Sequence, residues 1–463
     1  MNSTTKNICI KSALPFSKSS LCCFVAVSFL FFPVLATATA TIKDTNSVIK
    51  INKVDSVLKH IQKLQEISDK NGGNREAGSN GHAESVQYFS EQLRNAGLKV
   101  WTEKFEFLYS KTEHAQLMSN GKMLDLVPAM FSASTPGPIS ARPHFIGGNG
   151  CEKQQYLDVP RGSIIIIQES TNCTTQRQHL LANESGARAA IIASHTDTPL
   201  YILQKGTAHL DIPLVGISHP TYTKIHSDPS SLVLDVLMIT ERRWSMNLIA
   251  ENTGTKNLPA IEVGAHLDSV PQSPGINDNA TSAALLLDHA TSNASQPKSR
   301  TYRYMFWSAE EFIFAGSRSY LQTVINPDSI YAYVNLEMQS SPNSGYFYTR
   351  DTSGGNVSQR ISNSIIEAYQ KLGIEAEVDT NTIPRSDDSS YKDAGISTGG
   401  LWGGSFEIKN REQAIKWGGQ AGYPFDGCYH RPCDNYERVD QNKLHKTQFV
   451  LHHLLAKLDN AHD

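Results

Sequence analysis

Two histidines and a set of carboxylates stand in this chain at positions that suit metal chemistry. His266 and Asp268 follow the apolar run that begins at Ile261, and a second aspartate, Asp278, comes after a loop rich in proline and glycine. A metal-bound histidine commonly gives its second ring N–H to a carboxylate. Asp268 is two residues on, and therefore on the same side of a strand, so it is the expected partner of His266. A lone His-x-Asp is more often a hydrogen-bonded core histidine, so the hypothesis depends on further ligands.

Further candidate ligands follow the next apolar runs. Glu310 and Glu311 come directly after RYMFWSA, Glu337 ends YAYVNLE, and His430 lies in a Gly/Pro/Asp-rich loop near the C-terminus. Adjacent glutamates usually belong to a solvated surface, but here an apolar strand runs straight into them. Two imidazoles with several carboxylates suit a pair of zinc ions about 3.5–4 Å apart, the spacing of two-metal hydrolases.

The elements that must position these groups alternate between helix and strand. Apolar residues recur at helical spacing over 57–67 and 86–96, and KVWTEKFEF alternates in the manner of a strand. Later apolar strands are each followed by a helical segment. This alternation predicts an α/β fold, with a mixed, mostly parallel sheet and helices on both faces. Ligands of such open sheets bind at the carboxyl ends of the strands, where the candidate residues stand.

The pattern changes between about Thr112 and Trp244. Short strands and turns appear there, around GSIIIIQES, ANESGARAAIIASH and IPLVGIS. The order of these segments resembles the protease-associated domain, a small β-rich insert of several exopeptidases. We therefore expect a catalytic domain in two parts, 41–111 and 245–463, interrupted by this insert at 112–244. The insert could be a lid over the substrate path. The alternative is a packing domain without a catalytic part, because the insert contains no cluster of ligands.

Composition and charge narrow the classes of function. Lys and Arg number 42 against 45 Asp and Glu, so the net charge is −3, and 39% of residues are hydrophobic. These values fit a globular protein and give no support to nucleic-acid binding. Residues 1–40 have the layout of a secretory signal peptide, with an N-terminal membrane anchor as the alternative. We expect a monomer that is secreted, or periplasmic or lumenal, without membrane contact after cleavage.

Four cysteines remain once residues 1–40 are removed. In an oxidising compartment an even number favours two disulfides, and local spacing suggests Cys151 with Cys173 and Cys428 with Cys433. Metal binding by the second pair is the alternative, but no matching pair lies nearby in the sequence.

Six strings resemble, in order and spacing, the secreted dizinc aminopeptidases of the aminopeptidase S and aminopeptidase Y type. They are VGAHLDS, GINDNATSA, SAEEFIFAGS, NLEMQSSPNSGYF, RSDDSSY and WGGQAGYPFDGCYHRPCD, and the likeness covers the whole mature chain. The resemblance implies an enzyme that removes N-terminal, leucine-like residues from peptides through a hydroxide bridging two zinc ions. A carboxypeptidase of the same fold and a non-catalytic, receptor-like relative are the alternatives.

The resemblance also implies the metal ligands one by one. His266 would bind one zinc ion and Asp278 would bridge both. Glu311 and His430 would bind the other ion. Glu337 falls where the family has an aspartate, and its side chain is one methylene longer. We expect Glu337 to remain a ligand of the His266-side ion, with that ion the more weakly bound of the two.

Three further roles follow from the same resemblance. Glu310 would be the general base, Tyr429 would support the tetrahedral oxyanion, and Arg385 would face the substrate. A disulfide at Cys428 would close a tight loop around Tyr429 and fix it before substrate arrives. The chain departs from the family again at Asp388, where a histidine is usual.

Overall fold

The computed structural model describes residues 54–202, 210–324, 326–380 and 385–461. The expected signal peptide at residues 1–40 lies outside these described residues. Within them, none of the helices combines the length and the apolar character that crossing a membrane requires.

The first two helices form where the apolar spacing predicts them. They are α1 (Asp55–Lys70) and α2 (Asn80–Asn95). Helix α1 buries Val57, Ile61 and Leu64 along one stripe, which is the spacing of one helical face. Helix α2 begins after Ser79, whose hydroxyl accepts the N–H of His82 and so satisfies one of the free donors of the first turn.

The larger sheet has ten strands among the described residues, in the order β14-β13-β15-β12-β10-β11-β9-β1-β2, with β4 paired to β9. Its centre is parallel, because β10 pairs in parallel with β11 and β12, and β12 pairs in parallel with β15. The flanks are antiparallel where β9 meets β11 and β1, and where β13 meets β15. The strands are β1 (Lys99–Ser119), β2 (Lys122–Leu124), β4 (Ile139–Ala141), β9 (Leu232–Asn252), β10 (Ala260–His266), β11 (Tyr302–Trp307), β12 (Ile330–Glu337), β13 (Phe347–Arg350), β14 (Glu377–Val378) and β15 (Thr398–Trp402).

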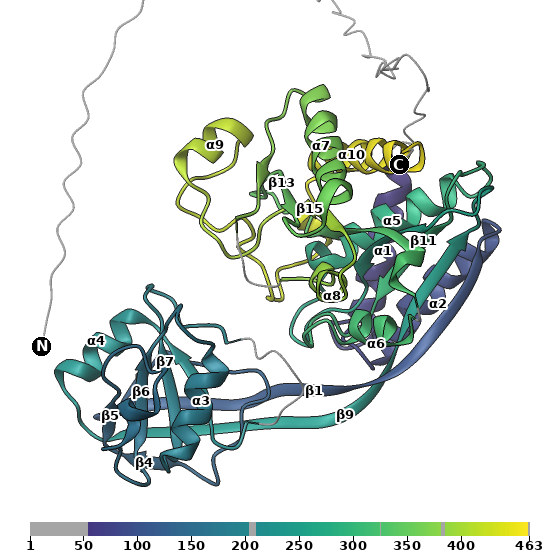
Figure 1. Ribbon diagram of the computed structural model, residues 1–463. Coiled ribbons are helices and arrows are strands. Elements are labelled where there is room, and N and C mark those ends of the chain that lie inside the picture. The colour runs from purple at the N-terminus through teal and green to yellow at the C-terminus, as the bar shows by residue number, and fades with distance from the viewer. Residues whose placement is uncertain (1–53, 203–209, 325, 381–384, 462–463) are drawn as a thin grey trace, which may run out of the picture. The chain divides into compact units, whose positions relative to one another are not determined.

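Helices cover both faces of this sheet (Figure 1). On one face α1, α2, α5 (Thr281–Ser292), α7 (Gly355–Lys371) and α10 (Gln441–Asp459) bury their apolar residues in one cluster with the strands. On the other face α6 (Ala315–Thr323) and α8 (Asp388–Asp393) pack tyrosines against Trp307 and Tyr333. Helix α9 (Arg411–Trp417) and the short turns Pro327–Ser329 and Tyr436–Arg438 lie in connections. The predicted mixed α/β fold is therefore confirmed.

The insert has its own sheet, in the order β3-β8-β7-β6-β5. Strands β6 and β7 are apolar and almost entirely buried, as parallel strands covered on both faces must be. The predicted Cys151–Cys173 disulfide is present beside this sheet's connections. The expected domain boundaries fall within β1 and β9, which run past residues 112 and 244, so these boundaries stay predictions. The elements are β3 (Val127–Pro128), β5 (Pro143–Phe145), β6 (Ile164–Gln168), β7 (Ala189–Ala193), β8 (Leu214–Ile217), α3 (Thr175–Glu184), α4 (His219–Ser227) and the turn Lys153–Tyr156.

Candidate metal centre

The candidate ligands meet at the carboxyl edge of the parallel strands. His266 is the last residue of β10 and Glu337 is the last residue of β12. The register pairs Gly264 with Asn335, so the two ligands lie side by side where their strands end. The neighbouring strand β11 ends opposite His266 as well, and the turn that follows it carries the two adjacent glutamates.

The turns after β11 and β12 and the loop that carries His430 use unusual backbone angles. Ala309 has a φ of 55°, Met338 a φ of 53° and His430 a φ of 58°, all in the left-handed region. A non-glycine residue held there costs roughly 1–3 kcal/mol and persists only where its surroundings enforce it. Each of the three is a candidate site residue or the neighbour of one. The chain therefore accepts local strain where it turns polar side chains toward one point.

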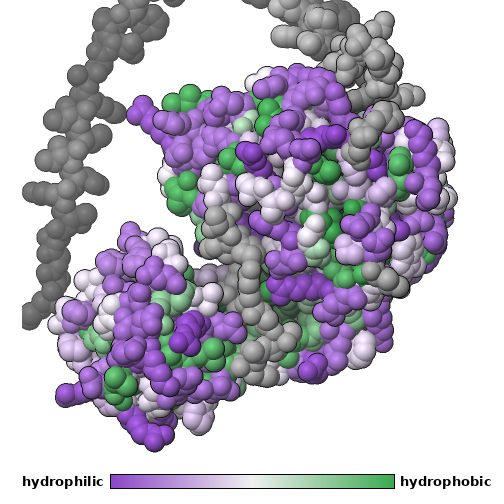
Figure 2. Space-filling view, viewed as in Figure 1, coloured by the Kyte–Doolittle hydropathy of each residue, from purple (hydrophilic) through white to green (hydrophobic). Residues whose placement is uncertain are grey.

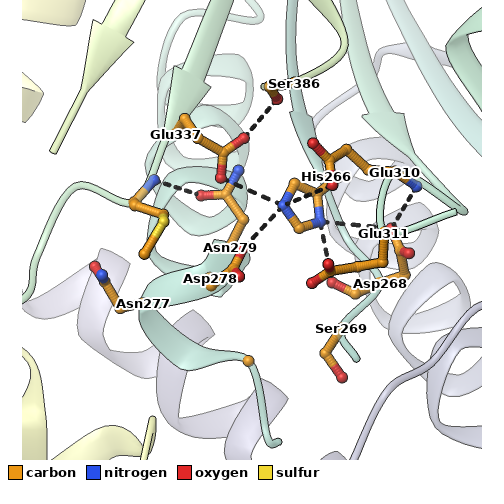
Figure 3. Close-up of polar contacts among 12 residues, drawn as sticks. His266, Asp268, Ser269, Asn277, Asp278, Asn279, Glu310, Glu311, Glu337 and Ser386 are labelled. Carbon is orange, nitrogen blue, oxygen red and sulfur yellow. Dashed lines mark hydrogen bonds and ion pairs between the residues drawn. The ribbon is translucent and has the colours of Figure 1, made fainter. Parts of the chain in front are cut away.

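The His266 side of the centre is built around the imidazole Nε2 (Figure 3). This nitrogen lies 3.1 Å from Asp278 Oδ1, 3.3 Å from Glu337 Oε1 and 3.9 Å from Glu310 Oε2. The other ring nitrogen, Nδ1, hydrogen-bonds to the backbone carbonyl of Asp268 at 3.1 Å, and the Asp268 carboxylate is 3.5 Å away. Asp268 thus meets His266 as expected, although the hydrogen bond goes to its backbone oxygen.

The His430 side uses the second oxygen of the same aspartate. His430 Nε2 lies 3.1 Å from Asp278 Oδ2 and 3.0 Å from Glu311 Oε2. The Tyr429 ring stacks on the His430 ring, with centroids 3.8 Å apart. The predicted disulfide from Cys428 to Cys433 closes this loop. Asp278 therefore faces one imidazole with each of its carboxylate oxygens.

The residues expected to meet substrate lie beside the His266 side. Arg385 forms an ion pair with Glu407, and its guanidinium lies over the Trp402 ring at 5.2 Å. Arg385, Asp388 and Glu337 line the same hollow. Burial raises the pKa of Asp388 to about 7, and the nearby Glu337 carboxylate adds to the rise.

The electrostatics of the centre are those of charges crowded together away from water. Burial raises the pKa of Glu310 well above its usual range, and Glu337 and Glu311 add to the rise. Burial likewise raises the pKa of Glu311 to about 7. Burial alone would lower the pKa of His430, but the carboxylates of Glu311 and Asp278 raise it to about 10. Crowded carboxylates raise one another's pKa in this way, and nearby positive charge favours their charged forms. Against the effect of burial, the two imidazoles accordingly lower the pKa of Asp278.

Several buried donor atoms of the centre lack a hydrogen bond, which bears on whether these residues fit zinc. Among the described residues, Glu311 Oε1 is buried and makes no hydrogen bond, and Glu337 Oε1 and His430 Nε2 lie 3.0–3.3 Å from ion-pair partners without a hydrogen bond to them. Buried polar atoms are normally satisfied, so each such atom calls for another partner. Imidazole nitrogens and carboxylate oxygens are zinc donors. Two groups of donor atoms lie within 4.8 Å of one another, namely His266, Glu310 and Glu337, and His266, Asp278 and Glu311. The residues fit a metal centre.

Sequence reasoning missed the groups that hold the ligands in place. The two asparagines that flank Asp278 are both almost fully buried. Asn279 donates to the carbonyl of Leu336 and accepts the N–H of Met338, so it holds the backbone directly before and directly after Glu337. Asn277 and Asp434 stand in strings that carry the family resemblance, and this was the one signal available for them.

Arg75 is a second missed residue, and it belongs to the loop after α1. Its guanidinium is buried and donates to the carbonyls of Leu267, Pro274 and Gly275. These carbonyls belong to the loop between His266 and the Asp278 turn. Nothing in the sequence around Arg75 points to partners so distant along the chain.

Comparisons with known proteins place this fold among peptidases. The profile described as "Peptidase family M28" matches residues 247–455, and that of the "PA domain" matches residues 135–225. The "Probable lipoprotein aminopeptidase LpqL" of Mycobacterium tuberculosis is 32% identical, over 84% of this chain and 82% of that protein. "Leucine aminopeptidase 2" of Trichophyton rubrum is 28% identical, over 85% of this chain and 81% of that protein. The solved aminopeptidase of Aneurinibacillus sp. strain AM-1 has the same fold, with a TM-score of 0.73 at 20% identity, covering 88% of this chain and 94% of that one.

Proposed function

Because this chain belongs to peptidase family M28, we propose that it is a secreted, zinc-dependent aminopeptidase that removes apolar N-terminal residues from peptides. Asp278 carries the proposal. Its two oxygens each lie 3.1 Å from a ring nitrogen, one of His266 and one of His430. A carboxylate that faces one imidazole with each oxygen could serve as a ligand shared by a pair of metal ions. Two disulfides support an oxidising compartment.

In this proposal Asp278 would be shared by two zinc ions. His266 and Glu337 would complete the ligands of one ion, and Glu311 and His430 would complete those of the other. Zinc bound there would supply Lewis acidity, which lowers the pKa of water toward about 7 and polarises a carbonyl group. The remaining steps fall to side chains of this chain.

Glu310 is the proposed general base. Its carboxylate is buried next to the His266 side, and its backbone N–H donates to Asp268 Oδ1 at 3.3 Å, which fixes the turn. Glu310 takes a proton from the attacking water and later gives it to the leaving amine as the C–N bond breaks. Tyr429 is proposed to donate its O–H to the oxyanion that forms in between. Burial raises the pKa of Tyr429 well above its usual value, so the phenol keeps its proton.

Glu337 is proposed as a ligand despite its extra methylene. Its Oε2 accepts the hydroxyl of Ser386 at 2.6 Å, and its Oε1 is the oxygen that faces His266. The Ser386 bond therefore leaves one oxygen directed at the centre. Because ligand distances of about 2.0–2.2 Å leave little tolerance, this ion is expected to be the more weakly held.

An apolar wall supports the preference for apolar residues. Met338, next to Glu337, packs in a buried cluster with Trp402 and Phe425, and Tyr429 lies against it. Phe406 extends this wall toward solvent, since it is 58% exposed and its ring lies 6.1 Å from the Tyr429 ring. On the face drawn in Figure 2 polar residues predominate, and apolar residues gather in separate patches, some of them on the lobe that carries α9. Arg385, whose guanidinium lies 5.2 Å from the Trp402 ring and 5.8 Å from the Phe406 ring, is proposed to face the substrate beside this wall.

Hydrolysis of leucine p-nitroanilide, with and without a zinc chelator, tests the proposal. We expect turnover that the chelator abolishes and added zinc restores. Turnover that the chelator does not affect, or release of C-terminal residues only from peptides, would contradict it.

A further inference from the structure

The turn that carries Asp278 is held by the loop that carries His430. Asp434 follows the disulfide of that loop, and its carboxylate accepts two consecutive backbone N–H groups. The N–H of Asn277 donates to Oδ1 at 2.7 Å and the N–H of Asp278 donates to Oδ2 at 3.1 Å. Asp434 as a whole is 1% exposed. Both oxygens are thus committed to the turn, away from water.

The same loop grips the turn at a second point. Asn277 Nδ2 donates to Asp426 Oδ2 at 2.6 Å, and Asp426 Oδ1 accepts the N–H of Cys428 at 2.8 Å. Asn277 Oδ1 accepts the N–H of Ser340, which lies just beyond Glu337. Asn277 therefore joins the segments of three proposed ligands.

We propose that Asp434 is a positioning residue for Asp278. Its carboxylate fixes the turn so that one Asp278 oxygen faces His266 and the other faces His430. The loop that supplies His430 would then also place the ligand that both metal ions share. This inference rests on the proposed function, because Asp434 has this task only if Asp278 binds metal.

The energetics favour a strong effect on metal binding. Without the Asp434 carboxylate, two buried N–H groups lose their acceptors, and an unsatisfied buried donor is unfavourable. The turn can then rotate, and the Asp278 carboxylate would rotate with it. Removing a partner that orients a ligand typically costs about 10–100-fold in metal affinity. Because Asp278 faces both sides, both ions should weaken.

Asp459 provides a matched control. Its carboxylate also accepts two consecutive backbone N–H groups, those of Ser299 at 3.1 Å and Arg300 at 3.0 Å. It lies at the end of α10 and contacts none of the proposed ligands. Asp459→Ala therefore removes the same kind and number of hydrogen bonds without touching the Asp278 turn.

The experiment measures zinc per chain and zinc affinity, by competition with a chromophoric chelator, together with the melting temperature. Asp434→Ala should bind zinc about 10–100-fold more weakly than wild type. Asp434→Asn keeps one oxygen acceptor, so its zinc affinity should lie between those of wild type and Asp434→Ala. Asp459→Ala should lower the melting temperature and leave zinc affinity unchanged.

Wild-type zinc affinity in the Asp434 variants, with a lower melting temperature alone, would mean that Asp434 only stabilises the fold. Asp434→Asn decides the matter if Asp434→Ala does not fold. A wild type that binds no zinc would overturn the proposed function and this inference with it. A wild type with two ions beside an unaffected Asp434→Ala overturns the inference alone.

Discussion

The two sides of the centre hold their ligands in different ways. On one side the His266 side chain is 1% exposed and that of Glu337 is 4% exposed. Each of these residues is the last one of a parallel strand at the centre of the sheet. On the other side the His430 side chain is 17% exposed and belongs to a disulfide-closed loop. The first pair is placed by strand register, which the whole sheet enforces. The second side is placed by one covalent bond and a few hydrogen bonds.

The side with the more rigid ligands is therefore not the side expected to bind its metal ion more tightly. The strand-end side is rigid, but it carries Glu337 in place of the usual aspartate. The loop side is less constrained by the fold, but its ligands are of the expected types. We therefore expect the rigid side to hold its ion more weakly, and the following variants are chosen to break or sharpen that comparison.

The largest effect is expected for Glu310→Gln, which should leave both sides intact. If Glu310 is the base and not a ligand, kcat should fall about 10²–10⁴-fold while two zinc ions per chain remain. Peptide turnover and metal analysis on the same preparation measure this. Its carboxylate lies 3.9 Å from His266 Nε2, so loss of one ion would mean that Glu310 is a ligand of the His266 side. Glu66→Gln, an exposed position on α1, serves as a control.

Glu337→Ala tests the strand-end side alone. Removal of a direct ligand should weaken one of the two ions by at least about 100-fold, the upper end of what loss of an outer partner costs. Glu337→Asp, the residue usual in the family, should tighten that ion. Stepwise chelation of the three proteins gives the measurement. Unchanged binding of both ions in Glu337→Ala would exclude Glu337 as a ligand.

Part of this centre could be predicted from the sequence, and the reason is local. His266 and Glu337 end apolar runs, so the pattern itself places them at strand ends. Asp434 could not be assigned in that way, because its bond to the N–H of Asp278 spans 156 residues of chain. The Arg75 bond to Leu267 spans 192 residues. Contacts of this kind depend on how the elements pack, which no periodicity encodes.

The full length of strand β1 could not be predicted from the sequence pattern either. Alternation of apolar and polar residues marks its first part, KVWTEKFEF, but the strand continues to Ser119. Its middle residues, Lys111 to Glu113, are exposed, and the register shifts between Thr112 and His114. A strand that is paired but buries few side chains needs no alternation of apolar and polar residues, so its sequence does not show that it is a strand. The expected boundary of the insert therefore fell inside a strand.

The two disulfides allow a matched test of the loop side. Loop closure predicts a stability loss of about 2 kcal/mol for the Cys428→Ser/Cys433→Ser pair and about 3 kcal/mol for Cys151→Ser/Cys173→Ser, which closes a longer loop. Only the Cys428→Ser/Cys433→Ser variant should bind one zinc ion more weakly, because only that disulfide adjoins His430. Urea unfolding and zinc competition report the two quantities. Equal zinc affinity in both double variants would mean that the disulfide does not hold His430.

The smallest effect on the metal centre is expected from a change in the helices that pack behind the sheet. His452 of α10 is buried beside His289 of α5, with ring centroids 4.6 Å apart. Burial lowers the pKa of His452 to about 4. The unfolded chain, with a histidine pKa near 6.5, then binds a proton more readily than the folded one. Stability is therefore present above about pH 6.5 and is lost as pH falls toward 4, by about 2 kcal/mol at pH 5.

His452→Leu should reduce this acid sensitivity, because His289 remains and burial also lowers its pKa well below the usual value. His195→Leu, at an exposed position of the insert, should leave the acid sensitivity unchanged. Urea unfolding at pH 5 and pH 7.5 gives the comparison. An unchanged pH dependence in His452→Leu would mean that another group titrates.

The central claim is that Asp278 is shared by two metal ions. A crystal structure of the zinc-loaded protein, with anomalous scattering measured at the zinc edge, tests it most directly. We predict two zinc peaks, one between Asp278 and the His266 side and one between Asp278 and the His430 side, with the first at lower occupancy after partial chelation. A single peak, or two peaks of which only one contacts Asp278, would contradict the account.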